Sequence, residues 1–348
     1  MKLALAPVRL KLTRPIQTAR GLMDVRIGWR VVLEADGVVG RGEAMPMASF
    51  GTEAPHATER ALREFSLDVL PDSLEAIARA TAGMWETPAA RFAVECALLE
   101  HLARRRRVPV AALFGTPRKQ LRVNALIEGD DAAGLAKAAE AAAAEGYPVV
   151  KVKVAARPLA VEAQRLLAVR RAIGPRVGLR LDANGAWSEA SARSALRGLE
   201  ALDAELCEQP VAAANVEGLR RIRYHVPCRI AADESMLLPQ VLDRMLEKDP
   251  AAAVDVVVLK PTALGGLLRS LEIARTAHAA GVGAYATTLM DGPLARAAAA
   301  HLAAVLPGDD AWAHGLSTVE LFGGAEPDAF TPVKGVIHLP DTPGWGVT

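Results

Sequence analysis

The sequence predicts a parallel α/β barrel that follows a smaller α+β domain. The chain has 348 residues, more than one domain usually holds. Short apolar segments bounded by Gly, Pro or Asn alternate with segments long enough for one helix each, which is typical of buried parallel strands joined by helices. Five of the apolar segments also end in charged residues, at residues 149–154, 177–182, 204–208, 229–234 and 254–260.

The spacing of these charges also favours a barrel. Successive charges, from Lys153 through Asp182, Glu208 and Asp233 to Lys260, lie 25 to 29 residues apart. One βα unit of a closed barrel has a similar length and returns each strand end to the same rim. Charges that only marked the exit of strands into water would have no reason to be sorted as lysine, three acids and lysine. We therefore interpret them as one functional set.

The remaining elements follow the same reasoning. The first, seventh and eighth barrel strands and two helices are predicted at residues 121–127, 281–288, 311–317, 131–145 and 293–306. Residues 1–50 indicate antiparallel strands with a hairpin turn at 34–37, and the region 53–107 has a helical pattern with its best helix opened by Pro88. We expect an α+β domain at 1–117, the barrel at 118–319, and a Gly- and Pro-rich tail at 320–348 that packs on the first domain.

Composition argues against several classes of protein. The net charge of +1 gives no sign of a nucleic-acid partner. No run approaches 18 uninterrupted apolar residues, and the N-terminal apolar stretch is too short for a signal peptide. The three cysteines, Cys96, Cys207 and Cys228, are widely spaced, which argues against a disulfide scaffold and fits a reducing compartment. We expect a cytoplasmic protein without membrane or nucleic-acid partners.

The rim charges predict metal-assisted acid–base chemistry on a small carboxylate. Side chains alternate along a strand, so Lys151 and Lys153 face the same way. Asp182, Glu208 and Asp233 offer only oxygen ligands, the set that Mg²⁺ accepts, with Mn²⁺ as a substitute. Metal charge would stabilise the enolate formed by proton removal beside a carboxylate, and would lower the pKa of a neighbouring lysine base. Lysines from two nearly opposite strands can then address the two faces of a planar enolate.

At these residues the chain resembles the enolase superfamily, specifically its muconate-lactonising subgroup. The resemblance extends over nearly the whole chain and rests on five motifs in order, Lys151-Val152-Lys153, residues 182–187, Glu208-Gln209-Pro210, residues 232–235 and Lys260-Pro261. It implies a (β/α)7β TIM-like barrel with an N-terminal α+β capping domain that the C-terminal tail completes. It also implies a role for each rim residue: metal ligands Asp182, Glu208 and Asp233, catalytic lysines Lys153 and Lys260 on opposite faces, and Lys151 as a supporting cation.

The resemblance also implies that capping-domain loops near Arg20 and at residues 47–51 touch the substrate. We expect substrate contacts from Arg20, Asn184 and Ser317, and also from Arg180, which is in phase with Asp182 on its strand and can tune the base or hold a carboxylate. Glu234 faces away from Asp233 by strand alternation, but strand ends twist, so a supporting position behind Asp233 stays open for it. The loop at residues 45–51 is rich in methionine and small residues. Such a loop suits a lid over a ligand and equally suits a plain surface connection, and the sequence leaves both interpretations open.

Within the subgroup the chain is most similar to the o-succinylbenzoate synthase family of menaquinone biosynthesis. The similarity lies in residues 180–185, 259–266 and 314–318. It implies a Mg²⁺-dependent syn dehydration, in which Lys153 removes the proton α to the substrate carboxylate and then helps hydroxide leave. The enediolate would be stabilised by the metal, and Lys260 would act electrostatically.

Three other activities stay open. An N-acyl amino acid racemase or dipeptide epimerase would use both lysines, but dipeptide epimerases similar to this chain carry Asp-x-Asp on the last strand, which here reads His314-Gly315-Leu316-Ser317. Asp291 offers a carboxylate nearby, although an N-cap role before the helix at Pro293 is the simpler expectation. A muconate-type cycloisomerase and a barrel that binds a small acid without catalysis are the others. The resemblance also allows a homo-oligomer.

Overall fold

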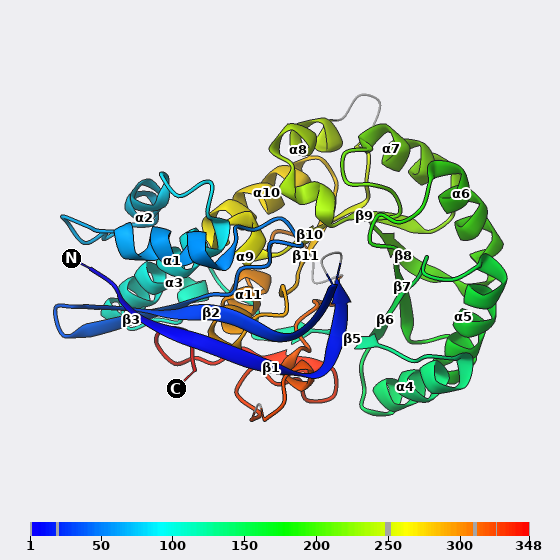
Figure 1. The fold of residues 1–348 in the computed structure, drawn as a ribbon, viewed down its shortest axis with the longest axis horizontal. Helices are drawn as coiled ribbons and strands as arrows, with labels where there is room; N and C mark the ends of the chain where they lie inside the picture. Colours follow the sequence, from blue (N-terminus) through cyan, green and yellow to red (C-terminus); the bar gives the residue numbers. More distant parts are fainter. Residues whose placement is uncertain (1, 19–20, 248–251, 309–311, 325, 348) are drawn as a thin grey trace.

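An α+β domain lies against a parallel barrel (Figure 1). The computed structural model describes residues 2–18, 21–247, 252–308, 312–324 and 326–347. The α+β domain contains a three-stranded antiparallel sheet in the order β1-β2-β3, with bounds Ala4–Thr18, Gly21–Ala35 and Val38–Ala44. Asp36 and Gly37 both have positive φ, so the hairpin turn predicted between the second and third strands is confirmed.

Three helices complete this domain, α1 (Pro55–Glu64), α2 (Leu74–Thr81) and α3 (Pro88–Arg105). Helix α3 begins at the predicted proline and is buried along nearly its whole length, because it packs between β3 and helix α9 (Pro261–Leu264) of the barrel. The carboxylate of Glu53 accepts hydrogen bonds from the amides of Ala89 and Ala90 at 3.0 and 2.9 Å. It therefore satisfies donors at the N-terminus of α3 that have no partner within the helix.

The barrel sheet contains seven strands in sequence order, and every neighbouring pair is parallel. Its strands are β5 (Asn124–Ile127), β6 (Val149–Lys153), β7 (Gly178–Asp182), β8 (Ala204–Glu208), β9 (Arg229–Ala232), β10 (Val256–Leu259) and β11 (Gly283–Ala286). A small cluster fills the interior, formed by Leu206, Ala231, Val256, Val258 and Tyr285. Alternate residues such as Cys207 and Val257 face outward and join the larger core beneath the helices, as a strand period of two requires.

Helices connect these strands around the outside of the barrel (Figure 1). They are α4 (Ala132–Ala144), α5 (Leu159–Ile173), α6 (Glu189–Gly198), α7 (Val216–His225), α8 (Pro239–Leu246), α9, α10 (Leu267–Ala279) and α11 (Pro293–Ala303). Four short 3₁₀ turns lie at Val110–Leu113, Glu200–Leu202, Glu234–Leu237 and Val319–Leu321. In Figure 1 the α+β domain lies beside α9, α10 and α11, and α4 to α6 lie on the far side of the barrel.

The barrel closes differently from the prediction. The predicted first strand at 121–127 is divided, because β4 (Gln120–Arg122) pairs with β12 (Val336–His338) of the tail and only β5 belongs to the barrel sheet. The predicted eighth strand is reduced to single bridges from His314 to Val123 and from Gly315 to Thr287, and residue 311 lies outside the described part. Backbone hydrogen bonds on both sides of this segment still link β11 to β5.

The C-terminal tail contacts both parts of the chain. Besides the pairing of β12 with β4, the Trp345 indole donates to the carbonyl of Arg41 in β3 at 3.0 Å. The Trp345 carbonyl lies 3.1 Å from a ring nitrogen of His301 in α11. A buried tryptophan therefore bridges β3 and α11 through directed polar contacts as well as packing.

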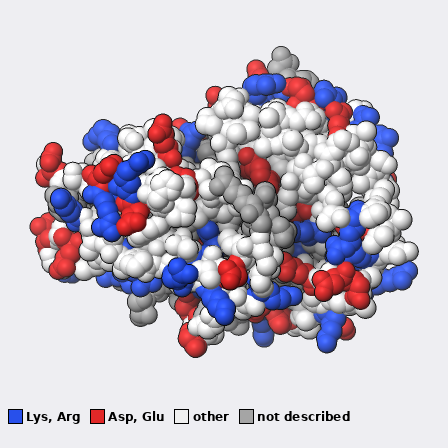
Figure 2. Space-filling view, viewed as in Figure 1, with Lys and Arg blue, Asp and Glu red and all other residues white. Residues whose placement is uncertain are grey.

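Two surface properties agree with the composition. In the described part of the chain, no helix combines the length and the apolar character needed to cross a membrane. On the face that Figure 2 presents, lysines and arginines are interspersed with aspartates and glutamates, which is consistent with a net charge of +1.

Candidate active site

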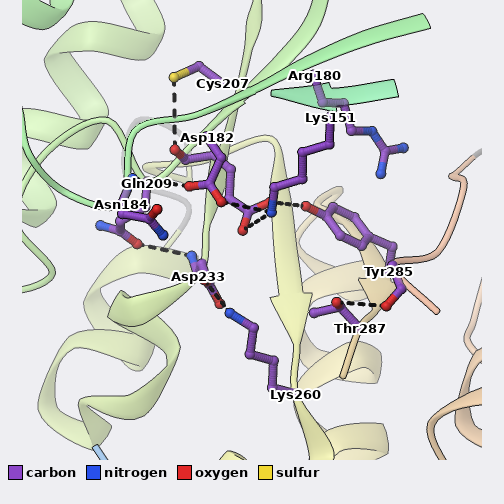
Figure 3. A network of polar contacts seen from close by, with 12 residues as sticks. Lys151, Arg180, Asp182, Asn184, Cys207, Gln209, Asp233, Lys260, Tyr285 and Thr287 are labelled. Atoms are coloured by element: carbon purple, nitrogen blue, oxygen red, sulfur yellow. Dashed lines mark hydrogen bonds and ion pairs between the residues drawn. The ribbon is translucent and has the colours of Figure 1, made fainter. Parts of the chain in front are cut away.

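The predicted rim charges meet around one cavity at the carboxyl ends of the barrel strands. This cavity has a volume of about 500 Å³. The predicted site residues that line it are Lys151, Lys153, Asp182, Asn184, Glu234, Lys260 and Ser317. Glu208 and Asp233 are buried directly beside them, and each binds one of these lysines. Strand-end charges that are far apart in sequence are therefore close in space (Figure 3).

Lys151 binds two of the predicted metal ligands. Its ammonium lies 2.8 and 2.7 Å from the two carboxylate oxygens of Glu208 and 2.9 Å from Asp182. Burial acts to lower the pKa of Lys151, but the charges of Asp182 and Glu208 outweigh burial and raise the pKa well above its usual value. Lys151 is therefore held as a cation and is unsuited to act as a base.

Tyr285 is a site residue that the sequence interpretation missed. Its hydroxyl donates to Glu208 at 2.5 Å, and burial raises the pKa of this phenol well above its usual value. It also lines the cavity from β11. The signal in the sequence is weak, because Tyr285 is a single inward-facing position in the four-residue strand Gly283–Ala286.

Lys260 occupies the other side of the carboxylates. Its ammonium lies 2.5 Å from Asp233, and the ring of Phe50 lies 3.9 Å from the same nitrogen. Figure 3 shows Lys151 and Lys260 approaching the carboxylates from different directions. Burial raises the pKa of Asp233 to about 6, although the charge of Lys260 opposes this shift. The side chain of Gln209 accepts the Asp233 amide at 3.0 Å and fixes the backbone there.

Lys153 has a different environment. It ends β6, its side chain is exposed toward the cavity, and no hydrogen bond or ion pair joins it to another described residue. The parallel register pairs Lys153 with Asp182 on the next strand. Besides Lys151, two lysines therefore reach the cavity: Lys153 at the end of β6, without a described partner, and Lys260 at the end of β10, bound to a carboxylate.

The donors fit the metal that the resemblance implies. Asp182 and Glu208 pair across neighbouring strands, Asp233 follows the next strand, and all three supply carboxylate oxygens, which a hard cation such as Mg²⁺ prefers. Among the described residues, no group of three such ligands is arranged to hold a metal ion. The oxygens of these carboxylates are instead bound by Lys151 and Lys260. Burial is the main cause of the raised pKa of Asp233, and a divalent cation bound to this carboxylate would favour its charged form.

Asn184, Ser317 and Glu234 all line the cavity. The Asn184 amide donates to Glu234 at 3.2 Å, and the Ser317 hydroxyl lies 2.7 Å from that of Tyr147. The sequence placed Glu234 behind Asp233, and the structure instead brings it to the cavity, because the chain turns into a 3₁₀ helix directly after Asp233.

Arg180 lies away from the predicted substrate position. It is fully buried inside the barrel, where its guanidinium binds Glu205 at 2.7 Å and the carbonyl of Ala313 at 2.7 Å. It also lies over the ring of Tyr285 at 4.6 Å, and it is not among the described residues that line the cavity. Arg180 faces the barrel interior, as predicted. It lies two residues before Asp182 on the strand, deeper in the barrel, where it packs against Tyr285 and does not reach the cavity. Arg20 lies outside the described residues.

The methionine-rich loop lies at the cavity. We call residues 45–52 the cap loop; its residues Met47, Ser49 and Phe50 line the cavity, which favours the lid interpretation over a plain surface connection. The Met47 carbonyl accepts the amides of Phe50 and Thr52, and the Met47 amide donates to the Thr52 hydroxyl at 2.6 Å. Other lining residues that the sequence interpretation did not name include Ile16, Asn124, Leu126, Thr287, Thr288 and Leu321.

The N-cap role expected for Asp291 is wrong. The N-cap of α11 is Gly292, and no side chain caps the helix from that position. Asp291 is buried and accepts hydrogen bonds from the Thr262 hydroxyl at 2.9 Å and from the Leu289 amide at 2.8 Å. The chain turns back at Met290, which has positive φ, and so directs the carboxylate toward α9 instead of α11.

Family models match both parts of the chain. Residues 134–348 match the model described as Enolase C-terminal domain-like, and residues 1–115 match Mandelate racemase / muconate lactonizing enzyme, N-terminal domain. Muconate cycloisomerase 1 of Acinetobacter baylyi is 30% identical over 283 residues, which cover 78% of this chain and 75% of that protein.

Solved structures have the same fold. The L-Ala-D/L-Glu epimerase from Bacillus subtilis superimposes with a TM-score of 0.88 at 26% identity, covering 100% of this chain and 99% of that chain. A dipeptide epimerase from Enterococcus faecalis V583, complexed with Mg and the dipeptide L-Leu-L-Tyr, gives 0.89 at 25% identity with the same coverage.

These findings confirm the expected fold and the expected family. They do not support the finer expectation of an o-succinylbenzoate synthase, because the relatives named here are a cycloisomerase and two epimerases. The matches to the two family models together span most of the sequence. The chain belongs to the enolase superfamily, in the group of mandelate racemase and the muconate-lactonising enzymes.

Proposed function

We propose that this protein catalyses proton transfer at a carbon bonded to a carboxylate, with racemisation or epimerisation as the outcome. One observation carries the proposal. Lys153 and Lys260 reach a single cavity from β6 and from the end of β10, with three buried carboxylates between them. A substrate held between two lysines can lose a proton on one face and gain a proton on the other.

The environments of the lysines assign their resting roles. Lys153 has no described partner and is exposed to the cavity, so it is free to exchange its proton with substrate and water. Lys260 donates a hydrogen bond to Asp233 and, from that position, would donate a proton to the substrate. Lys151 stays charged between Asp182 and Glu208 and adds positive charge near the substrate carboxylate. For the opposite enantiomer, Lys153 and Lys260 exchange roles.

Asp182, Glu208 and Asp233 would hold Mg²⁺, with Mn²⁺ as a substitute. When bound, the cation would supply the charge that makes a proton beside a carboxylate acidic enough for an amine to remove. The remaining contributions come from the chain itself. Gln209 fixes the backbone of Asp233, and Tyr285 orients Glu208 from inside the barrel.

The cavity favours an N-acyl amino acid as substrate. Gly315, Ser317 and Thr318, which line it from the last barrel segment, are neutral, and within the described residues no carboxylate from that segment reaches the cavity. A free ammonium group would find no counter-charge there. The hydroxyls of Ser317, Thr318 and Thr287 can instead donate to an amide oxygen and accept from an amide N–H.

The test is solvent deuterium incorporation. Protein with Mg²⁺ in D₂O is incubated with N-acetyl and N-succinyl amino acids of both configurations and with free dipeptides, and loss of the α-proton signal is followed by NMR together with optical rotation. We expect exchange and racemisation of N-acyl substrates and no exchange of dipeptides. The Lys153→Ala, Lys260→Ala double variant serves as the control for background exchange. Absence of exchange for every compound with Mg²⁺ present would refute the proposal.

A second candidate is a muconate-type cycloisomerase. It is favoured by the relative from Acinetobacter baylyi, at 30% identity over 78% of this chain. This reaction needs one proton-transfer lysine, so the second lysine would serve only as a charge. Loss of cis,cis-muconate absorbance, without α-proton exchange of N-acyl amino acids, would establish this candidate. The cyclohexadiene precursor of o-succinylbenzoate is included in the same absorbance assay, since dehydration would deplete its diene.

A further inference from the structure

A buried arginine, Arg26, joins the cap loop to the rim of the barrel. Arg26 belongs to β2 and is only 3% exposed. On the side of the cap loop, its guanidinium donates to the carbonyls of Met45 and Pro46 at 2.6 and 2.7 Å. On the side of the barrel, it donates to the carbonyls of Leu289 and Met290 at 3.3 and 3.0 Å. Four backbone carbonyls from two separate segments thus share one rigid set of donors.

Asp291 holds this arginine from the barrel side. One carboxylate oxygen of Asp291 lies 3.9 Å from the Arg26 guanidinium, and both side chains are buried. The other oxygen accepts the Thr262 hydroxyl and the Leu289 amide. Thr262 lies in α9, two residues after Lys260. The arginine is therefore linked, through one carboxylate, to the segment that carries a catalytic lysine.

The cap loop contacts the same lysine at its other end. The ring of Phe50 lies 3.9 Å from the ammonium of Lys260. Between the two contacts, Met47 packs with Ala263 of α9 and Leu289 of the rim in a small apolar cluster. The cap loop therefore contacts the segment 260–263 both through the ring of Phe50 and through Met47. A displacement of the cap loop should therefore also displace this segment, because the contacts are closely packed.

We propose that Arg26 and Asp291 are positioning residues that fix the cap loop over the cavity and thereby fix the direction of Lys260. Neither residue is among the described residues that line the cavity, so their effect passes through the Met45 and Pro46 carbonyls and through Thr262. The inference rests on the proposed two-lysine reaction for its kinetic consequence. Loosening the arginine should slow α-proton exchange of the enantiomer that gives its proton to Lys260 more than exchange of the one that gives it to Lys153.

Hydrogen exchange of the cap loop tests the positioning directly. The amides of Phe50 and Thr52 are bonded to the Met47 carbonyl, and their exchange reports local opening. In Arg26→Met their exchange should accelerate roughly 10- to 100-fold, since hydrogen bonds from a charged donor are lost. Asp291→Asn should show a smaller acceleration, and Arg26→Lys an intermediate one, because an ammonium cannot reach four carbonyls at once.

The matched control is Arg30→Met, an exposed position on the same strand, which should leave cap-loop exchange unchanged. If Arg26→Met fails to fold, Arg26→Lys and Asp291→Asn provide the same comparison. Unchanged loop exchange in folded variants would overturn the inference, whether or not any substrate is turned over. Failure of the positioning role can thereby be distinguished from failure of the proposed function.

Exchange of the α-proton of each enantiomer with D₂O, followed before racemisation proceeds, provides the second readout, because abstraction and return of the proton on one face use one lysine. General destabilisation lowers the exchange rates of both enantiomers by the same factor. Positioning of Lys260 instead predicts slower exchange of the enantiomer that gives its proton to Lys260, with the ratio of the two exchange rates changing roughly fivefold or more in Arg26→Met. Partial restoration of that ratio in Arg26→Lys would strengthen the inference, and an unchanged ratio in every variant would contradict it.

Discussion

The two sides of the cavity carry the same residue type in different settings. On the β10 side, Lys260 is bound to Asp233 and covered by Phe50 of the cap loop. Helix α10, which comes after the short helix α9, is also bonded to the capping domain, since Glu95 of α3 accepts the amides of Leu267 and Leu268 at 2.5 and 3.1 Å. On the β6 side, Lys153 is exposed, and α4 and α5 lie far from the capping domain (Figure 1).

This difference shows how a repeating barrel can produce two unlike lysines. Each βα unit brings its strand end to the same rim, so the barrel alone makes the two positions equivalent. Among the described residues, the capping domain contacts Lys260 through Phe50 and has no hydrogen bond or ion pair to Lys153. We therefore expect Lys153 to tolerate motion and exchange protons readily, and Lys260 to depend on contacts made by another domain.

The largest expected effect comes from removing either lysine. Lys153→Ala should lower racemisation by about 10²- to 10⁴-fold, because proton transfer by a positioned group contributes that much, and Lys260→Ala should do the same. Each variant should still exchange the α-proton of the single enantiomer that faces its remaining lysine. NMR in D₂O with each pure enantiomer measures this.

Lys137→Ala, at an exposed position on α4, is the matched control and should retain wild-type rates. If Lys260→Ala retained racemisation and exchange of both enantiomers, proton transfer on the two faces of the substrate would not be assigned to separate lysines, and Lys260 would serve as a charge alone.

Loss of a carboxylate ligand should come next in size. Asp182→Asn and Asp233→Asn should each weaken Mg²⁺ binding at least about tenfold. Mutation of residues that merely hydrogen-bond metal ligands already lowers metal affinity by about that factor, and a lost ligand should lower the affinity at least as much. Titration calorimetry measures the affinity, and chelation by EDTA should abolish turnover reversibly. The two variants differ in one respect, because only Asp233→Asn also releases Lys260. Equal Mg²⁺ affinity in wild type and both variants would remove these residues from the metal site.

The strand-end charges could be predicted from the sequence because they depend on local rules. The period of two places alternate residues on one face, and the spacing of the βα units returns each strand to the rim. Asp182, Glu208 and Lys260 lie where these rules put them. Side chains two residues earlier on a strand point to the same face, so the same rules predict that Arg180 faces the cavity. These rules do not give the depth of a side chain in the barrel, and Arg180 lies deeper, against the ring of Tyr285.

Features that depend on contacts between distant segments could not be predicted. The tail strand β12 takes β4 out of the barrel sheet, and nothing within residues 120–122 signals this. Asp291 precedes a helix and so fits the pattern of an N-cap, but its partners, Thr262 and Arg26, lie in other elements. The same holds for Phe50, whose contact with Lys260 requires the whole capping domain to be in place.

A smaller effect concerns the pH dependence of the capped β10 side. Burial raises the pKa of Glu95 to about 7, although hydrogen bonds from backbone N–H groups at the N-terminus of α10 oppose this shift. The folded state therefore binds this proton more tightly than the unfolded state, whose carboxyl has a pKa near 4.5. This contribution to stability is complete below about pH 4.5 and is lost as the pH rises through about 7, by an amount on the order of 1–3 kcal/mol.

Glu95→Gln should flatten that dependence, because an amide does not titrate while its oxygen can still accept an N–H from α10. Urea unfolding at intervals from pH 5 to pH 8 measures the change in the free energy of unfolding. Glu64→Gln, at an exposed position on α1, should leave the pH profile unchanged. A profile for Glu95→Gln as steep as that of the wild type would mean that Glu95 is not a source of the pH dependence.

The smallest effect we predict is also the one that addresses the difference between the two sides most directly. Phe50→Leu keeps an apolar side chain in the cap loop but removes the ring that lies 3.9 Å from Lys260. A cation–π contact of this kind is worth about 0.5–1 kcal/mol, so α-proton exchange in D₂O of the enantiomer that gives its proton to Lys260 should change roughly twofold to fivefold. Exchange of the enantiomer that gives its proton to Lys153 should be unaffected, because the lysine that Phe50 contacts is Lys260. Phe50→Tyr retains a ring face and should preserve the wild-type ratio of the two rates. Equal changes for both enantiomers in Phe50→Leu would show that the loop acts on the cavity as a whole, and that the capping domain does not single out Lys260.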